Sequence, residues 1–255
     1  METLKNIVTD LDRLLEPEKF KDYAPNGMQV EGREQVTKIV TGVTASRALI
    51  ERAIESKADL ILVHHGYFWP GEDPCIVGMK KKRFELLIKN DITLLAYHLP
   101  LDAHPVLGNN AQLALKLGFE VEKGLGSGAD LAGGLVGRLI KPCDVDTLSA
   151  RIKGELNRAP LVISEHLPAD KLISRIAWCS GAAQGFIGKA VAQGVDAYLT
   201  GEVSEQTVHE AREHSIGFFS AGHHATERYG VQAVGEYLAD KFDISHQYIE
   251  VDNPV

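Results

Sequence analysis

Short apolar runs alternate with amphipathic stretches along the first part of the chain. Residues 38–43, 58–63 and 92–97 have the length and β-branched content of buried strands. Between them, residues 45–56 and 79–89 carry apolar positions at helical spacing. Because strands that alternate with helices are typical of βαβ units, the pattern predicts an α/β fold with a largely parallel sheet.

The same pattern recurs later in the sequence. Residues 38–59 align without a gap on residues 175–196. Residues 92–98 resemble residues 216–223, with one residue inserted. Any two βαβ units share some likeness, but a match without gaps favours an internal duplication.

The repeat also predicts the domain organisation. We expect two similar α/β domains, the first over residues 1–124 and the second over residues 125–255. The glycine-rich stretch 124–134 is the expected junction between them.

Composition and charge narrow the class of protein. The 255 residues are 44% hydrophobic and 24% charged, which is typical of a soluble globular protein. A net charge of -8 argues against nonspecific nucleic-acid binding, which needs a basic surface. No apolar stretch approaches the roughly 20 residues that cross a bilayer, and the N-terminus lacks the pattern of a signal peptide. Three scattered cysteines, each expected to be a small buried side chain, fit a reducing compartment, so we expect a cytoplasmic protein.

Histidines and carboxylates gather where the predicted strands end. His64 and His65 follow the strand ending at residue 63. Two further segments that follow predicted strands carry similar residues. The segment in the first half contains His98, Asp102 and His104, and the one in the second half contains His223, His224 and Glu227. Ligands of open α/β sheets bind beyond the carboxyl ends of the strands, and imidazole with carboxylate suits Zn, Mn, Fe or Ni. A lone buried histidine is usually just hydrogen-bonded, but three such segments at equivalent strand ends favour a metal site.

Six long segments of the chain resemble a known family. This is the family of dinuclear-metal proteins named GTP cyclohydrolase I type-two homologues, which are the YbgI-like proteins. The matching segments cover residues 23–32, 38–46, 61–69, 97–114, 200–214 and 221–230. They occur in order and span nearly the whole chain, with the weakest match at about residues 122–172.

The resemblance implies both an architecture and a ligand set. It implies two interlinked α/β domains and a homohexameric ring, a trimer of dimers with the metal sites facing its interior. It also implies two divalent metal ions per chain, bound by His64, His65, Asp102, His223 and Glu227. His98 lies near this set. Since the set draws on both halves, we expect the site in the cleft between them.

The hypothesis that best unites these features is a metal-dependent hydrolase. Two cations would lower the pKa of a shared water, giving a nucleophile at neutral pH. By resemblance, the substrate would be a purine nucleotide attacked at C8 of its imidazole ring. His98, Glu202 and His104 are the candidates for general acid–base catalysis. Glu202 occupies the repeat position of His65, although an acidic residue at a helix start is an equally simple reading.

Two other functions stay open at this point. The metals could serve delivery or sensing without catalysis, or the ring could be a scaffold linked to the DNA-damage response. Residues 67–69 are aromatic and would stack on a planar base or pack against another subunit. P-loop, dinucleotide-binding and serine-hydrolase signatures are absent from the sequence.

Overall fold

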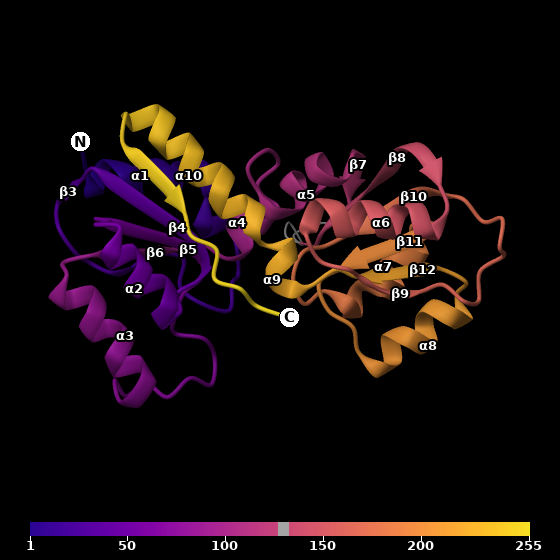
Figure 1. Ribbon diagram of the computed structural model, residues 1–255, viewed down its shortest axis with the longest axis horizontal. Coiled ribbons are helices and arrows are strands. Elements are labelled where there is room, and N and C mark those ends of the chain that lie inside the picture. The colour runs from indigo at the N-terminus through magenta and orange to yellow at the C-terminus, as the bar shows by residue number, and fades with distance from the viewer. Residues whose placement is uncertain (127–132) are drawn as a thin grey trace. The chain divides into compact units, whose positions relative to one another are not determined.

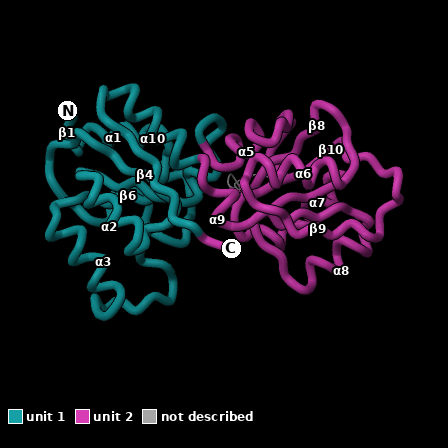
Figure 2. Tube along the Cα trace, viewed as in Figure 1, with its two compact units in different colours: residues 1–107, 230–252 teal, residues 108–229, 253–255 magenta. Residues whose placement is uncertain are grey.

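The computed structural model describes residues 1–126 and 133–255, so part of the predicted 124–134 junction lies outside the described residues. The chain forms two compact units (Figure 2). Unit 1 contains residues 1–107 and 230–252, and unit 2 contains residues 108–229 and 253–255. The first boundary therefore falls at 107/108, where we had expected 124/125, and a C-terminal segment returns to unit 1.

The sheet of unit 1 is parallel except for one edge strand. Its order is β13-β4-β5-β6-β2 (Figure 1). β4 (Lys38–Thr44), β5 (Leu60–His65) and β6 (Thr93–Ala96) run parallel, as their apolar runs predicted. β13 (Ser245–Tyr248) extends the parallel set beside β4, and β2 (Gly27–Val30) pairs antiparallel with β6.

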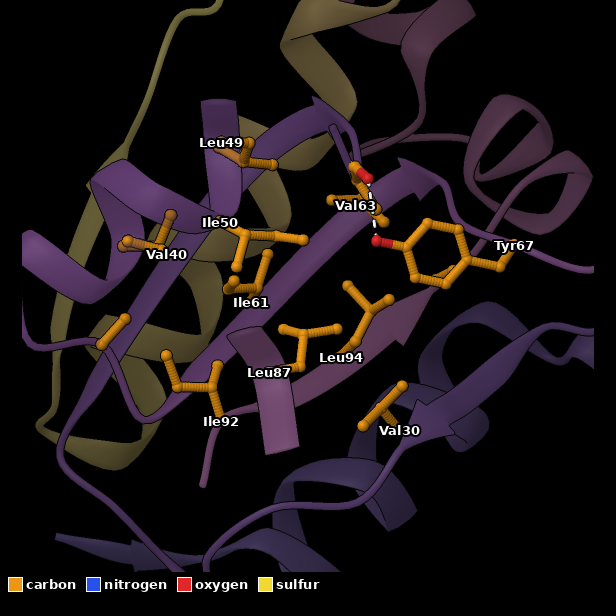
Figure 3. Close-up of a cluster of buried hydrophobic side chains, with 14 of the residues drawn as sticks. Val30, Val40, Leu49, Ile50, Ile61, Val63, Tyr67, Leu87, Ile92 and Leu94 are labelled. Atoms are coloured by element: carbon orange, nitrogen blue, oxygen red, sulfur yellow. Dashed lines mark hydrogen bonds between the residues drawn. The ribbon is translucent and has the colours of Figure 1, made fainter. Parts of the chain in front are cut away.

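Both faces of this sheet are covered by helices, which explains the unbroken apolar runs of its strands. On β5, Ile61 and Val63 pack in one cluster with residues of α2 (Arg47–Glu55) and α3 (Gly78–Lys89) (Figure 3). Leu60 and Leu62 point to the other face and pack with residues of the two remaining helices. Those helices are α1 (Leu4–Leu15) and α10 (Arg228–Phe242). Short elements complete the unit: β1 (Glu2–Thr3), η1 (Pro17–Lys19), β3 (Gln35–Val36) and α4 (Leu99–Ala103).

Unit 2 contains a six-stranded sheet of order β7-β8-β10-β11-β12-β9. The three strands β10, β11 and β12 are parallel, and the other pairings are antiparallel. The strands are β7 (Phe119–Gly124), β8 (Leu135–Cys143), β9 (Leu161–Ile163), β10 (Ile173–Trp178), β11 (Ala197–Thr200) and β12 (Gly217–Ser220). The prediction of two similar α/β domains is thus confirmed. The sheet of unit 1 is largely parallel, as predicted, whereas in unit 2 the parallel part is limited to β10, β11 and β12.

Helices cover both faces of the second sheet as well. Leu199 packs with residues of α5 (Asn109–Leu117) and α6 (Val145–Leu156), while its neighbour Tyr198 packs with residues of α7 (Ile187–Ala192) and α8 (Glu205–Glu213). The remaining elements are η2 (Gln184–Phe186) and α9 (His223–Thr226). No helix in residues 1–126 or 133–255 is long and apolar enough to cross a membrane.

The prediction that each cysteine is a small buried side chain holds for Cys179 alone, because Cys143 is half-buried and Cys75 is exposed.

An aspartate that accepts backbone hydrogen bonds marks the same position in both repeats. Asp59 accepts hydrogen bonds from the backbone N–H groups of Thr37 and Lys38 at 2.8 and 3.1 Å. At the aligned position of unit 2, Asp196 accepts them from the N–H groups of residues 174 and 175 at 3.0 and 2.9 Å. The gapless alignment therefore describes a shared hydrogen-bonding frame and supports an internal duplication.

The two halves exchange their last helix and strand. The segment after β6 forms α5 and β7, which belong to unit 2. The segment after β12 forms most of α10 and all of β13, which belong to unit 1. β7 lies in the sheet of unit 2 because it pairs with β8, and β13 lies in the sheet of unit 1 because it pairs with β4. This exchange is the physical form of the predicted interlinking and explains the shifted boundary.

Candidate metal centre

Unit 1 gathers three histidines at one end of its parallel strands. His64 and His65 are the last residues of β5, which ends two residues later than the strand we predicted, and His98 directly precedes α4. One ring nitrogen from each of the three lies within 4.8 Å of the others. The ring centroids of His64 and His65 are 4.6 Å apart, although neighbours in a strand normally point to opposite faces. The end of the strand therefore brings both rings into one group.

The two adjacent histidines each use Nδ1 for a contact within the protein. His64 Nδ1 lies 3.1 Å from the carbonyl oxygen of Tyr97, to which it donates a hydrogen bond. His65 Nδ1 lies 3.3 Å from the hydroxyl of Thr44 on the neighbouring strand. The other ring nitrogen of His64, Nε2, is 3.6 Å from Oδ1 of Asp102. Metal-binding histidines commonly have this arrangement, in which the second ring nitrogen is held by the protein.

His98 is held by a carboxylate that our sequence reasoning missed. Its Nδ1 lies 2.8 Å from Oδ1 of Asp22. Burial by itself would raise the pKa of Asp22, but hydrogen bonds from His98, Asn26 and the Leu99 N–H lower it to about 2. Asp22 is therefore an anion at neutral pH. The signal in the sequence was the run Asp22–Gly27, which directly precedes β2 and overlaps a family segment.

Close packing explains the glycine that follows the two histidines. A Cβ on Gly66 would lie 2.2 Å from Oε1 of Gln29 and 2.6 Å from Cβ of Ala96. The same Gln29 oxygen accepts a hydrogen bond from the N–H of Tyr67 at 2.7 Å. Only glycine therefore lets the chain leave β5 in this direction.

The three aromatic residues after Gly66 have different environments. Tyr67 belongs to the core and donates from its hydroxyl to the carbonyl of Ala45 at 2.9 Å (Figure 3). Phe68 is 41% exposed. The ring of Trp69 lies 4.9 Å from that of His98 and 5.8 Å from that of His65. Trp69 is thus the aromatic residue that borders the histidines.

Unit 2 carries its own group of ligand atoms around His223. α9 begins at His223, and Glu227 follows its last residue, so the pair lies about one turn apart. His223 Nε2 is 3.2 Å from Oε2 of Glu227, and its Nδ1 is 2.7 Å from Oε1 of Glu202. Burial alone would lower the pKa of His223, but Glu227 and Glu202 raise it to about 9. A divalent cation at Nε2 would take the place of that proton.

Gly181 makes room for these side chains. A Cβ at this position would lie 2.1 Å from Oε1 of Glu227 and 3.2 Å from Nε2 of His223. Its φ of +66° is also a conformation that favours glycine. The backbone therefore approaches the carboxylate and imidazole more closely than any larger residue would permit.

The other predicted residues have identifiable roles in the structure. Nδ1 of His104 accepts hydrogen bonds from the N–H groups of Val106 and Leu107, and burial lowers its pKa. Within the described part of the chain, His104 belongs to none of the close groups of ligand atoms. Glu202 contacts His223 directly, so its first role is to hold that ring.

Comparison with known proteins agrees with this architecture. The sequence profile of Duf34/NIF3 (NGG1p interacting factor 3) matches residues 2–254. The chain belongs to the Duf34/NIF3 family. A Pseudomonas aeruginosa relative named GTP cyclohydrolase 1 type 2 homolog is 56% identical over 251 residues, covering 98% of each chain. A Vibrio cholerae relative of the same name is 54% identical over 245 residues, covering 96% of each.

Solved structures of this family share the whole fold. Protein ybgI, described as of unknown function, is 47% identical, with a TM-score of 0.94 over 99% of this chain and 100% of the other. TTHA1606 from Thermus thermophilus is 31% identical, with a TM-score of 0.88 over 99% and 100% of the two chains. The family resemblance seen in the sequence is thereby confirmed, and residues that could bind metal ions are present in this member.

Proposed function

We propose that this Duf34/NIF3 protein binds two divalent metal ions through ligands from both of its units. The ligands are His64, His65, Asp102, His223 and Glu227. The observation that carries the proposal is how the protein holds the histidine rings. In His64, His65 and His223 a protein group contacts Nδ1 and orients the ring, as is common in metal-bound histidines.

The donor set fits a transition-metal dication better than an alkaline-earth ion. Three imidazoles and two carboxylates combine nitrogen and oxygen donors, which suit Zn, Mn, Fe or Ni. Asp102 and Glu227 supply the negative charge that two dications require, and each carboxylate has two oxygens with which to bridge them. Magnesium and calcium sites, in contrast, are built from oxygen ligands.

We further propose that the protein is a hydrolase that acts on a nucleotide-like substrate. The ions would supply Lewis acidity and a nucleophile at neutral pH. The shared name of the Pseudomonas and Vibrio relatives supports a purine nucleotide as the substrate class. His98 would move the proton to the leaving group, since it stands in one group with His64 and His65 and borders Trp69.

Metal analysis of the purified protein tests the binding part of the proposal. We expect about two ions per chain, as in other two-metal sites, and their loss in Asp102→Ala. Asp59→Ala is the matched control, because Asp59 is also a buried aspartate of unit 1 and its side chain accepts hydrogen bonds from Arg33, Thr37 and Lys38. Full metal content in a folded Asp102→Ala variant would contradict the proposed ligand set.

A panel of purine nucleotides, read by mass spectrometry, tests the reaction. The metal-loaded protein should convert at least one member, and His98→Gln should lower turnover more than metal content. If the loaded protein converts none of them while binding both ions, the hydrolase proposal is wrong and metal delivery or sensing takes its place.

A further inference from the structure

The turn formed by residues 22–27 has no part in the ligand set proposed above, yet its first side chain is completely engaged. Asp22 Oδ1 accepts hydrogen bonds from His98 Nδ1 at 2.8 Å and from the Tyr23 N–H at 2.6 Å. Oδ2 accepts from the Leu99 N–H and from Asn26 Nδ2, both at 2.9 Å. The Asp22 side chain is only 4% exposed. Its orientation is therefore fixed by four donors.

The same turn also holds the backbone of His98. Oδ1 of Asn26 accepts a hydrogen bond from the His98 N–H at 2.7 Å, while Nδ2 of Asn26 donates to Asp22. Ring and backbone of His98 are thus fixed by two side chains that also bind one another. Such a closed set of hydrogen bonds restricts the imidazole to one orientation.

Unit 2 repeats this contact with a carboxylate from a different place. His223 aligns with His98 in the repeat, and its Nδ1 lies 2.7 Å from Oε1 of Glu202. Glu202 aligns with His65, which is a proposed ligand in unit 1. Unit 1 therefore has no carboxylate at that position, and Asp22 supplies one from the turn before β2. A carboxylate behind the same histidine in both repeats, from unrelated positions, points to a functional requirement.

We infer that Asp22 is a positioning residue that keeps the proton of neutral His98 on Nδ1 and so presents the Nε2 lone pair to a metal ion or a substrate proton. The carboxylate acts because Nδ1–H is the only group of a neutral imidazole that can donate to it at this place. It also makes Nε2 a stronger electron donor, as carboxylates behind metal-bound histidines do. The use made of the lone pair rests on the proposed function, but the proton position does not.

Loss of the charge should affect His98 far more than its two neighbours. His64 is held by a carbonyl and His65 faces a hydroxyl, both neutral groups that Asp22 does not contact. In Asp22→Asn, the amide nitrogen must face either His98 together with the Tyr23 N–H, or the two donors on Leu99 and Asn26. Only the imidazole can respond by moving its proton, so we expect the amide nitrogen to face His98 and the proton to shift to Nε2.

Nitrogen-15 NMR of the imidazoles in metal-free protein at pH 8 tests this inference. Wild type should show His98 with a protonated Nδ1 and a bare Nε2, and Asp22→Asn should reverse the two. Asp22→Ala, which removes both acceptors, should give a mixture of the two forms. A folded Asp22→Asn or Asp22→Ala protein that keeps the wild-type pattern at His98 would overturn the inference.

Two variants serve as matched controls. Asp59→Asn removes the charge of another buried carboxylate of unit 1 that accepts backbone N–H bonds, so it should leave the His98 signals unchanged. Glu202→Gln removes the charge of the carboxylate beside His223 and should likewise leave the His98 signals unchanged. A change at His98 in either variant would count against the assignment of Asp22.

A zinc titration against a competing chelator then connects the proton position with binding. Zinc affinity should fall about 10- to 100-fold in Asp22→Asn if the His98 lone pair binds a metal ion beside the proposed ligands, and should keep its wild-type value if the lone pair takes the substrate proton. If wild type binds no zinc but the NMR pattern reverses as expected, the proposed function fails while the role of Asp22 stands. An unchanged affinity together with an unchanged NMR pattern would refute the role of Asp22.

Discussion

Unit 1 and unit 2 hold their candidate ligands on the same frame but with different side chains. In both, the second strand of the parallel set and the segment after the third strand carry the key residues. Unit 1 has His65 where unit 2 has Glu202, and Asp102 where unit 2 has Glu227. The frame of buried strands is thus shared, while the residues at the strand ends differ, because packing does not restrict them in the same way.

The largest effect that tests this comparison concerns the two cores. Leu62 and Leu199 are aligned in the repeat and fully buried in their own units. Truncation to alanine leaves a cavity, so each variant should lose about 2–5 kcal/mol in the free energy of unfolding of its unit. Urea denaturation followed by amide hydrogen exchange measures both. Leu115→Ala, at a 71% exposed position, should stay within about 0.5 kcal/mol of wild type.

A smaller loss of stability is expected at Gly181, where the backbone lies close to the side chains of Glu227 and His223. Gly181→Ala should cost about 1–3 kcal/mol and lower the metal content expected of the proposed ligand set, because the added Cβ would overlap the carboxylate of Glu227. Gly194 also has a positive φ, of +65°, but has no atoms within 4 Å of an added Cβ. Gly194→Ala should therefore cost only about 1 kcal/mol and leave metal content unchanged. Equal metal loss in both variants would show that the space at Gly181 is unimportant.

The aligned aspartates should make the stability of the two units depend on pH in the same way. Burial by itself would raise the pKa of both Asp59 and Asp196, but hydrogen bonds lower it, chiefly from the Thr37 hydroxyl at Asp59 and from the Arg175 N–H at Asp196. Their stabilisation is therefore complete above the unfolded-state pKa of about 3.9 and is lost as the pH falls through the lower pKa of the folded state. Asp59→Asn and Asp196→Asn should each flatten the fall in stability of their own unit below about pH 4. A steeper fall in either variant would contradict the sign.

The smallest effect concerns one backbone position. Lys57 has a φ of 58°, and the aligned residue of unit 2 is Gly194. Lys57→Gly relieves a left-handed conformation but makes the unfolded chain more flexible, so stability should change by less than about 1 kcal/mol. Gly194→Lys should instead destabilise unit 2 by about 1 kcal/mol. Thermal unfolding of both variants tests whether the repeat shares its backbone at this position.

Much of the candidate site was predictable because its signals are local. His64 and His65 follow an apolar run, and their position at the end of a strand needs only the rule that α/β sheets bind ligands there. Asp22 was not predictable in this way, since it contacts His98 across 76 positions in the chain. His104 lies close to Asp102 in the sequence, yet a turn uses its ring to bind backbone N–H groups.

The sequence by itself determined the α/β class, the repeat and the types of ligand, because these depend on periodicity and on residues next to strand ends. Even the aligned Asp59 and Asp196 could be matched without coordinates. Only the tertiary structure decided that α5 with β7 and α10 with β13 change units. Either half offers similar edges and faces to these segments, so their local sequence does not select a unit. The long-range packing and strand pairing that make this choice also bring Asp22 to His98.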